Sequence, residues 1–338
     1  MTRGLSPERA REVLTCGAGA RFAVVGDVFL DRYLVGRAER LSREGPVPVL
    51  AFRRTFDLPG GAANPARNLA TLGATVIQVG VVGDDADGRA FTAALGEAGI
   101  DGSGIVVDPS RPTTLKLRVV AEGLAVPQQV ARLDRQCRDA VSGAAARELV
   151  EAVRRAAAQA DAVLLSHYRS GVVGPAVRDA ARLAAAGRSA LLAADAQGDL
   201  PLFRGFDVVR VGRQDAGRTL TEGIADESQL EQAVVRLRSE LGARVLLLGR
   251  GAEGMTLADE DGVEHIRPAN VSEVFDVAGA GDSVIAVATL SMVGGATARE
   301  AARLANLAAG VVVRRLGVAA PTVTEIVSEL ERARDVPD

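Results

Sequence analysis

The chain has 338 residues, 48% of them hydrophobic and 25% charged, which is enough apolar material to bury a large core in one or two domains. A formal net charge of −3 provides no basic surface for nucleic acid or an anionic membrane, and no apolar run reaches the roughly 18 residues of a membrane span. Two cysteines are too few for a disulfide framework and two distant histidines give no zinc spacing, so we expect a soluble cytoplasmic protein.

Short apolar runs rich in β-branched residues predict strands, and amphipathic patterns between several of them predict helices. The predicted strands cover residues 22–28, 75–83, 161–166, 189–195, 206–212 and 243–249, and the clearest helices cover 145–160, 227–241, 283–295 and 298–317. This alternation predicts an α/β fold of three layers, with a mainly parallel sheet covered on both faces. Ligands in such folds bind beyond the carboxyl ends of the strands.

Two segments depart from the alternation, at about residues 33–58 and 113–133. Both consist of extended, partly polar stretches that are too short to build a core of their own. We expect them to form a small β-sheet lid over the mouth of a single domain that spans residues 1–338.

The stretch "GRGAEG" at 249–254 matches the glycine spacing of dinucleotide-binding loops. That function requires a helix after the last glycine, with its N-terminus at the pyrophosphate. Here two short strands around an Asp-Gly turn are predicted instead, at residues 255–266. The dinucleotide interpretation therefore fails.

The stretch "GAGD" at 279–282 has the context that the previous stretch lacks, because the apolar run 283–290 predicts a helix directly after it. Gly279 and Gly281 permit backbone geometries in which successive N–H groups, with that of Ala280 between them, face one anion at a helix N-terminus. Asp282 would then be a general base beside a bound phosphoryl group. Spacing alone leaves a second interpretation open, in which Asp282 is the helix N-cap.

A further group of polar residues suits a polyhydroxylated ligand. Asn64 and Asn68 lie four residues apart on one face of a predicted helix, directly after the glycine pair Gly60-Gly61. Asp27 and Asp31 follow the first strand, at its carboxyl end. Carboxylates and amides gathered there bind neighbouring hydroxyl groups, although each stretch by itself is more often a turn or a cap.

Lys116 is the single lysine among 40 basic residues. Its presence in an arginine-rich chain reflects either chance or a need for a compact ammonium group. Arg118 lies two residues further on, on the same face of the predicted strand, so the pair is suited to clamping a phosphate.

Several collinear motifs resemble the ribokinase-like (PfkB) carbohydrate kinases, and among them the kinase domain of the bacterial heptose 7-phosphate kinases. The motifs are "VVGDVFLDRY" (24–33), "PGGAANPARNLATLGA" (59–74), "TLKLRVV" (114–120), "QQVARLD" (128–134), "EVFDVAGAGDSVIAV" (273–287) and "ANLAAGVVVRRLG" (305–317). The resemblance spans residues 20–327. It implies a ribokinase-like fold, a homodimer formed through the lid, and no nucleotidyltransferase domain in this sequence.

The resemblance also implies ATP and Mg²⁺ as cofactors and phosphate transfer to the anomeric hydroxyl of a heptose 7-phosphate. Asp282 would be the base and Gly279–Gly281 the anion hole, while the sugar would be held by Asp27, Asp31, Gly60, Gly61, Asn64 and Asn68. From their shared strand face, rather than from the resemblance, we expect Lys116 and Arg118 to hold the 7-phosphate. On the nucleotide side the implied residues are Asp215 (also the metal candidate), Arg250, Gly251, Gly254, Asn306, Ala309, Gly310 and Gly317.

Departures from the family pattern cluster on the triphosphate side. The pattern "LSDYxKG" reads "LSHYRSG" with His167, and "DPKG" reads "DAQG" with Gln197. The pattern "TPNxxE" reads "RVGRQD" at 210–215, so that Gly212 and Asp215 stand for Asn and Glu. Threonines are replaced by Ala278 and Gly249. Losing one contact to a developing anion costs roughly 10²–10³ in rate, so these changes predict a slow or absent kinase step.

Three functions remain open at this point: a heptose 7-phosphate 1-kinase, a PfkB kinase for another sugar or sugar phosphate, and a non-catalytic sugar-phosphate-binding protein. The complete "GAGD" element favours the first. His167 is either a replacement ligand or a structural histidine satisfied by its neighbours.

Overall fold

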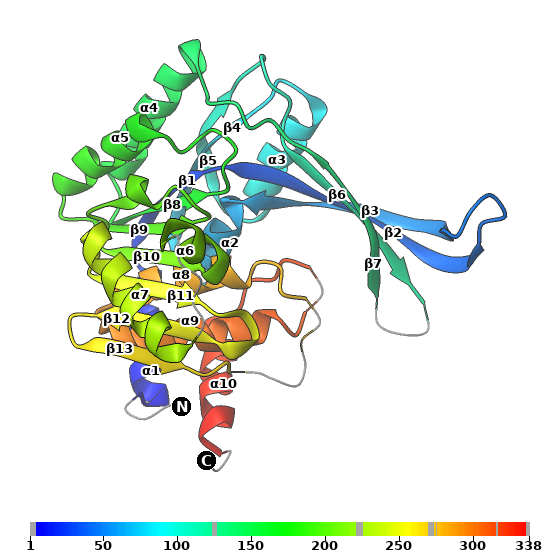
Figure 1. The fold of residues 1–338 in the computed structure, drawn as a ribbon. Coiled ribbons are helices and arrows are strands. Elements are labelled where there is room, and N and C mark those ends of the chain that lie inside the picture. Colours follow the sequence, from blue (N-terminus) through cyan, green and yellow to red (C-terminus); the bar gives the residue numbers. More distant parts are fainter. Residues whose placement is uncertain are drawn as a thin grey trace.

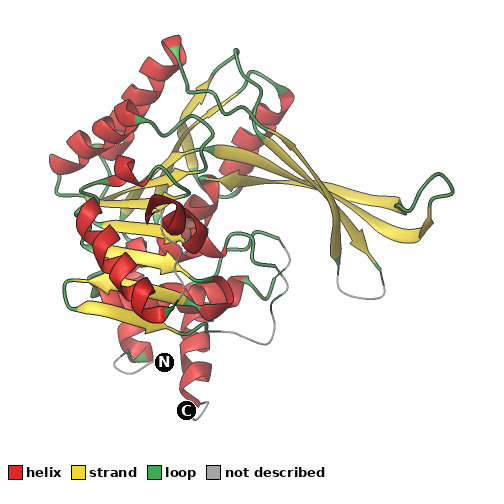
Figure 2. Ribbon diagram, viewed as in Figure 1, coloured by secondary structure: helices red, strands yellow, loops and turns green. Residues whose placement is uncertain are grey.

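The computed structural model describes residues 5–123, 127–220, 226–269, 274, 276–315 and 317–335. Its centre is a nine-stranded sheet in the order β13-β12-β11-β10-β9-β8-β1-β4-β5, visible in Figures 1 and 2. Pairings from β11 to β5 are parallel, whereas β11–β12 and β12–β13 are antiparallel. The strands are β1 (Arg21–Gly26), β4 (Thr75–Val82), β5 (Asp101–Val107), β8 (Ala162–His167), β9 (Leu191–Ala196), β10 (Val208–Gly212), β11 (Val245–Gly249), β12 (Met255–Asp259) and β13 (Gly262–Ile266).

Helices cover both faces of this sheet. Successive residues of β1 show the two sides, because Phe22 and Val24 belong to one buried cluster while Ala23 and Val25 belong to the other. The first cluster includes residues of α1 (Pro7–Ala18), α2 (Ala63–Thr71), α3 (Ala86–Glu97), α8 (Ala280–Val293), α9 (Ala298–Val312) and α10 (Val323–Asp335). The second includes residues of α4 (Gly143–Ala157), α5 (Pro175–Ala186), α6 (Arg213–Leu220), α7 (Glu227–Leu241) and the short turn η1 (Leu200–Phe203).

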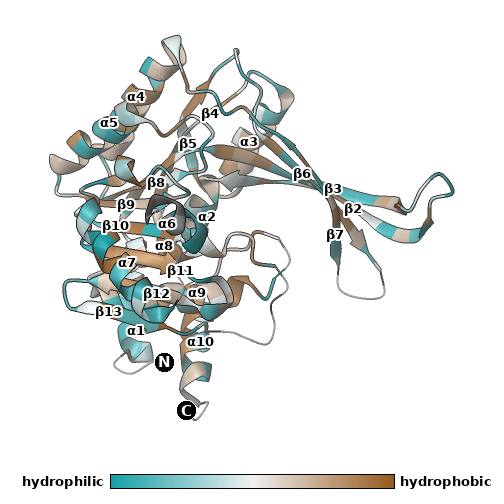
Figure 3. Cartoon of the chain, viewed as in Figure 1, coloured by the Kyte–Doolittle hydropathy of each residue, from teal (hydrophilic) through white to brown (hydrophobic). Residues whose placement is uncertain are grey.

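The predicted three-layer α/β fold is therefore confirmed. Figure 3 shows apolar strands inside and polar outer helix surfaces, as expected for a sheet buried on both faces. Strand β5 was not predicted. Its first half is Asp-Gly-Ser-Gly, and only its second half, Ile-Val-Val, is apolar. It lies at the edge of the sheet, where fewer of its side chains need to be buried.

A second sheet of four strands projects from this body (Figure 1). Its order is β3-β2-β6-β7, formed by β2 (Val28–Leu41), β3 (Pro48–Gly61), β6 (Leu115–Glu122) and β7 (Gln128–Arg135). Both predicted lid segments belong to it, but the strands β2 and β3 extend beyond them, from Val28 and up to Gly61. The sheet has only a small buried cluster, of Tyr33, Val35 and Val120, so it has no sizeable core of its own, as predicted.

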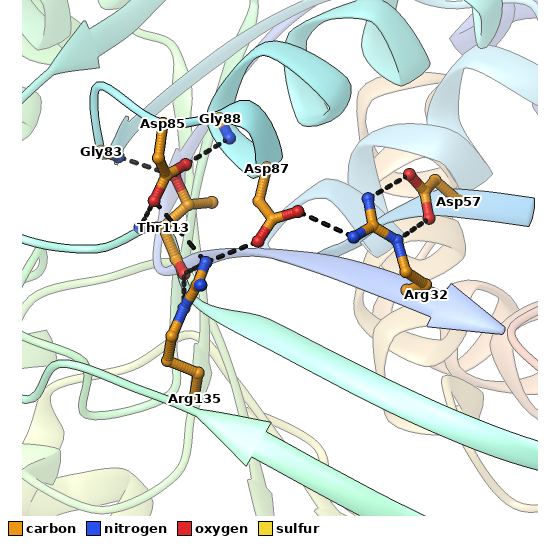
Figure 4. A network of polar contacts seen from close by, with 8 residues as sticks. All are labelled: Arg32, Asp57, Gly83, Asp85, Asp87, Gly88, Thr113 and Arg135. Atoms are coloured by element: carbon orange, nitrogen blue, oxygen red, sulfur yellow. Dashed lines mark hydrogen bonds and ion pairs between the residues drawn. The ribbon is translucent and has the colours of Figure 1, made fainter. Parts of the chain in front are cut away.

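An ion-pair network joins the root of the lid to α3 (Figure 4). Asp87 on α3 accepts hydrogen bonds from Arg32 on β2 at 2.9 Å and from Arg135 on β7 at 2.6 Å. Arg32 also forms a two-pronged pair with Asp57 on β3. The helix N-cap Asp85 accepts from Thr113, just before β6. Three of the four lid strands, and the segment that leads into the fourth, are thereby fixed near the body at their inner ends.

In the part of the chain that the structure describes, no helix has the length and apolar character needed to cross a membrane.

Candidate active site

The "GAGD" element forms the N-terminus of α8, a helix of 14 residues. Its N-cap is Gly279, whose φ of 80° lies in the left-handed region that favours glycine, and no side chain of the described residues caps the helix. The positive end of the helix dipole is therefore free of a protein anion at the cap position. The alternative in which Asp282 is the N-cap is wrong, because Asp282 lies in the first turn of the helix.

The Asp282 carboxylate accepts hydrogen bonds from two side chains of the described residues. The Tyr168 hydroxyl donates to Oδ1 at 2.6 Å, and the Asn64 amide of α2 donates to Oδ2 at 3.1 Å. Burial, and then the charge of Asp195, raise the pKa of Asp282 from 3.8 to about 7, although Tyr168, Arg210 and Asn64 act in the opposite direction. A carboxylate with this proton affinity is suited to act as a general base near neutral pH.

Tyr168 lies on the loop that follows β8, and Asp27 holds that loop in place. One Asp27 oxygen accepts from the backbone N–H groups of Tyr168 at 2.7 Å and Ser170 at 3.1 Å, and the other accepts from that of Val172 at 3.1 Å. Burial, and then the neighbouring Asp282, raise the pKa of Tyr168, so its hydroxyl keeps its proton and donates. Asp27 therefore positions Tyr168, while its predicted contact with a substrate stays a prediction.

Asp31 on β2 is buried beside a glycine and an arginine. Arg118 on β6 donates to Asp31 at 2.5 Å. Asp31 Oδ2 lies 2.1 Å from the point that a Cβ on Gly60 would occupy, so only glycine leaves room for this carboxylate. A Cβ on Gly61, whose φ is 62°, would likewise lie 2.3 Å from the Asp27 carbonyl oxygen. The predicted glycine pair is therefore required by packing around the two aspartates.

Lys116 lies next to Asp31 in the pairing of β2 with β6. Its ammonium group sits 4.0 Å above the Phe29 ring and 5.5 Å from that of Tyr168, which is cation–π geometry. Burial lowers the pKa of Lys116. The structure thus brings Lys116, Arg118 and Asp31 close to the Tyr168–Asp282 pair, while their contacts with a sugar phosphate stay predictions.

The two asparagines of α2 have different surroundings. Asn64 contacts Asp282, whereas Asn68 donates to the Asn64 carbonyl at 2.8 Å and so binds its own helix. The side-chain oxygens of both are buried and accept no hydrogen bond from a described residue. Of the two asparagines, Asn64 is therefore the one that contacts Asp282.

The predicted nucleotide-side residues lie on four separate elements. Arg250 is tied to Glu253 at 2.8 Å and Glu227 at 3.2 Å, in the turn from β11 to β12 that also contains Gly251 and Gly254. Because β12 rather than a helix follows, the dinucleotide interpretation is indeed excluded. The other members are Asp215 in the first turn of α6, Asn306, Ala309 and Gly310 on α9, and Gly317 after α9.

Two of these residues donate hydrogen bonds, one to a backbone carbonyl and one to a side-chain carboxylate. The Asn306 amide donates to the Arg267 carbonyl at 2.8 Å, and the Gly317 N–H, with φ of 76°, donates to Asp276 at 3.0 Å. None of the hydrogen bonds described above connects the nucleotide-side residues to Asp282. Their roles in nucleotide binding stay predictions.

His167 is buried at the end of β8. Its Nε2 lies 3.1 Å from Asp199, its Nδ1 lies 3.7 Å from Asp27, and its ring contacts Phe203. Nδ1 is buried and has no hydrogen-bond partner among the described residues, so His167 is only partly satisfied and both interpretations stay open.

Four residues near the site were not identified from the sequence: Arg67, Tyr168, Asp195 and Arg210. Asp195 and Arg210 lie near the carboxyl ends of the paired strands β9 and β10, where α/β folds bind ligands, and that position is the signal that could have found them. Tyr168 comes two residues after the predicted strand at 161–166 and directly follows the observed strand β8. Arg67 lies between the two asparagines of α2, and burial lowers its pKa.

Comparison with known proteins gives the family. Residues 20–325 match the model of the pfkB family of carbohydrate kinases. The protein named bifunctional protein HldE from Paramagnetospirillum magneticum is 38% identical over 93% of this chain, and its namesake from Caulobacter sp. (strain K31) is 40% identical over 92%. The chain spans 64% and 62% of the length of these two relatives.

Solved structures agree on the fold. Ribokinase from Arabidopsis thaliana, in complex with ribose and ATP, has a TM-score of 0.70 at 21% identity, with 93% of this chain and 99% of that chain covered. Phosphofructokinase-2 from Escherichia coli has a TM-score of 0.76 at 17% identity, with the same coverage. The ribokinase-like fold is confirmed, and this chain belongs to the pfkB family of carbohydrate kinases.

Proposed function

We propose that this carbohydrate kinase transfers the terminal phosphoryl group of ATP to the anomeric hydroxyl of a heptose 7-phosphate, with Asp282 as general base. The observation that carries the proposal is the position of Asp282, with its raised pKa, in the first turn of a helix whose N-terminus is capped by no side chain that the structure describes. The motifs that resemble heptose 7-phosphate kinases, and the relatives named bifunctional protein HldE, support the acceptor.

The proposed step is a direct displacement. Asp282 takes the proton of the anomeric hydroxyl, and the sugar oxygen forms a bond to the terminal phosphorus of ATP. The bond from that phosphorus to the bridging oxygen breaks and ADP leaves, so the products are the sugar 1,7-bisphosphate, ADP and one proton. The Gly279–Gly281 amides stabilise the charge on the transferred group, as preorganised donors do in general.

On the sugar side, Asp31, Asn64 and the Gly60-Gly61 backbone would contact hydroxyl groups. Lys116 and Arg118 would bind the 7-phosphate, because both cations lie on one face of β6 beside Asp31. Asp27 and Asn68 would act through the loop and the helix that they hold.

The residues present fit ATP at the α8 N-terminus, since an uncapped helix end and the nearby Arg210 guanidinium both favour an anion. Among the described residues no group of three or more His, Cys, Asp or Glu side chains is arranged to hold a metal. Mg²⁺ that arrives with ATP needs only one or two carboxylates besides phosphates and water, and Asp215 is the proposed one. The ion neutralises phosphate charge when it is bound.

We also propose that two copies associate through the lid. Leu41, Phe52 and Leu133 on three of its strands are each about 70% exposed, and such apolar side chains are commonly covered by a partner. A two-fold axis would cover the same face on both copies.

A second candidate, a sugar-phosphate-binding protein without kinase activity, is favoured by the residues Gln197, Gly212 and Ala278 at family positions that contact the triphosphate. Purified protein with MgATP and heptose 7-phosphate decides between them: we expect a bisphosphate product and its near loss in Asp282→Asn. Sugar-phosphate binding without ATP consumption would establish the second candidate, and turnover of another sugar in a substrate panel would replace heptose as the acceptor.

A further inference from the structure

Arg210 lies between the sheet and the turn Gly279–Gly281, which is the proposed anion hole and is called the anion-binding turn below. It is near the carboxyl end of β10, directly beside Asp195 of β9 in the strand register. Its guanidinium donates to Asp195 at 3.0 Å, and the Asp195 side chain is almost completely buried. The cation is therefore fixed in direction by one carboxylate on the neighbouring strand.

The guanidinium packs flat against the anion-binding turn. A Cβ on Gly281 would lie 2.6 Å from both Cζ and Nη2 and 2.7 Å from Nη1 of Arg210. A Cβ on Gly249 would lie 3.1 Å from Nη2. Nearly equal distances to three guanidinium atoms mean that the Gly281 backbone covers the face of the planar group. Glycine at 281, and the absence of a larger side chain at 249, leave the space that the guanidinium occupies.

Two departures from the family pattern complement each other here. Position 210 is the first residue of the "RVGRQD" stretch, where the pattern has threonine, and position 249 also has threonine in the pattern. In this chain a long cation occupies one position, and the other position lacks the side chain that would collide with it. The same chain lacks the family's side chains at Gln197, Gly212 and Ala278.

The guanidinium has fewer protein acceptors than it needs. Its single hydrogen bond to a described residue is the one to Asp195, and Nε is buried without a partner. A guanidinium carries five N–H donors, and a buried one is normally surrounded by acceptors. Arg210 also interacts electrostatically with Asp282 and Tyr168. A group rich in anionic oxygens beside Gly281 would supply the missing acceptors.

We propose that Arg210 binds the terminal phosphoryl group of ATP and is a further catalytic residue. It supplies the positive charge that is lost where Gln197 replaces the family's lysine, and donors in place of the neutral side chains missing at Gly212 and Ala278. The inference rests on the proposed kinase function and deepens it. Asp195 positions the guanidinium, and the planar fork offers paired donors to phosphoryl oxygens. The charge stabilises the oxygens of the transferred group while the bond to the bridging oxygen breaks.

The test measures the contribution of the terminal phosphate to binding separately from that of the rest of the nucleotide. Calorimetry measures the binding of AMP, ADP and adenylyl imidodiphosphate, each with Mg²⁺, to the wild type, Arg210→Lys and Arg210→Gln. We expect Arg210→Gln to weaken adenylyl imidodiphosphate binding about tenfold or more relative to AMP, and to lower kcat by roughly 10²–10³, as for loss of one transition-state donor. Arg210→Lys should recover part of both losses, because it keeps a charge.

A control is needed because Arg210→Gln leaves Asp195 buried without its cation. The double variant Arg210→Gln/Asp195→Asn keeps a hydrogen-bonding pair without charge, and it should show the same selective loss while unfolding at about the wild-type temperature. Gly249→Thr places a side chain against Nη2, so it should also weaken the triphosphate analogue more than AMP.

The outcomes separate this inference from the proposed function. If Arg210→Gln and the double variant bind adenylyl imidodiphosphate as the wild type does, or turn over as fast, Arg210 does not contact the phosphoryl group and the inference is overturned. If the wild type transfers no phosphate but its preference for the triphosphate analogue is lost in Arg210→Gln, Arg210 binds the phosphoryl group as proposed, whereas its catalytic role and the kinase proposal both fall.

Discussion

The Tyr168 hydroxyl donates a 2.6 Å hydrogen bond to Oδ1 of Asp282, although the two residues are 114 positions apart in the sequence. This bond favours the charged form of the carboxylate and opposes the effects of burial and of Asp195, which raise the pKa of Asp282 to about 7. The proton affinity of the proposed base is therefore set by groups on separate elements: the loop after β8, β9, β10 and α2, all facing α8.

We expect kcat/KM to rise with pH through about 7 in the wild type, because the deprotonated carboxylate is the base and this parameter reports the free enzyme. Tyr168→Phe removes a hydrogen bond that lowers the pKa of Asp282, so the rise should move to higher pH. At pH 7 we expect a loss of roughly tenfold, given that a hydrogen bond to a charged group contributes about 1.5–3 kcal/mol. Most of the loss should disappear at pH 9.

Asp195→Asn is the matched opposite of this change. It removes a charge that raises the pKa of Asp282, so the rise in kcat/KM should move to lower pH. Shifts of the two profiles in the same direction would contradict the assignment of Asp282 as the titrating group.

Asp282→Asn should stabilise the fold while it removes activity. The folded-state pKa of Asp282 is raised from 3.8 to about 7, so the favourable contribution of its protonated form is complete below pH 4 and is lost as pH rises through 7. Asparagine stays neutral and keeps both partners, since Tyr168 can accept from its amide. At pH 8 we expect an increase of about 1–3 kcal/mol in unfolding free energy and an increase of a few degrees in Tm.

Thermal unfolding of both proteins at pH 5 and pH 8 checks this prediction. The advantage of the variant should be larger at pH 8. A variant that is less stable than the wild type at pH 8 would show that the buried charge is better compensated than we infer.

Gly60→Ala should weaken sugar binding. The added Cβ would lie 2.1 Å from Asp31 Oδ2, so the carboxylate must move and its contact with Arg118 is disturbed. We expect KM for the sugar phosphate to rise tenfold or more, with a smaller change in KM for ATP. Gly96→Ala is the matched control, because Gly96 lies in α3 with no atom within 4 Å of a new Cβ, and alanine there should stabilise the helix by about 0.5–1 kcal/mol. Equal effects of the two substitutions on KM would contradict the role of Asp31.

Phe52→Ser with Leu133→Ser should disrupt self-association. Both side chains are 69% exposed on the lid, so the substitutions leave the single chain intact and remove apolar surface that two copies would share. Light scattering at micromolar concentration should give a dimer for the wild type and a monomer for the variant. A monomeric wild type would exclude the proposed lid contact.

The sequence predicted those elements whose pattern is local. Apolar β-branched runs predicted the strands β1, β4, β8, β9, β10 and β11, and the amphipathic pattern of α7 matched its observed range Glu227–Leu241. Strand β5 was missed because Gly102 and Gly104 interrupt its pattern. The lid was predicted as a sheet, but the start of β2 at Val28 was not. The first residues of β2 are buried in the body, so the strand runs continuously from the core into the lid.

The site was predicted where the glycine and aspartate pattern is contiguous. Gly279, Gly281 and Asp282 lie at the start of α8, where the pattern placed them, while their catalytic roles stay predictions. Tyr168, Asp195 and Arg210 were not predicted as site residues, because each is a single side chain near the end of a strand with no pattern around it.

By itself the sequence determined the layers of the fold, the helix that begins at the "GAGD" turn, and the likeness to carbohydrate kinases, since these depend on periodicity and on contiguous residues. Only the tertiary structure decided that Asp282 is buried against Tyr168 and Asn64 and that the Arg210 guanidinium covers Gly281. The reason is physical: desolvation and charge interactions depend on distances between strands and helices that are far apart in the chain.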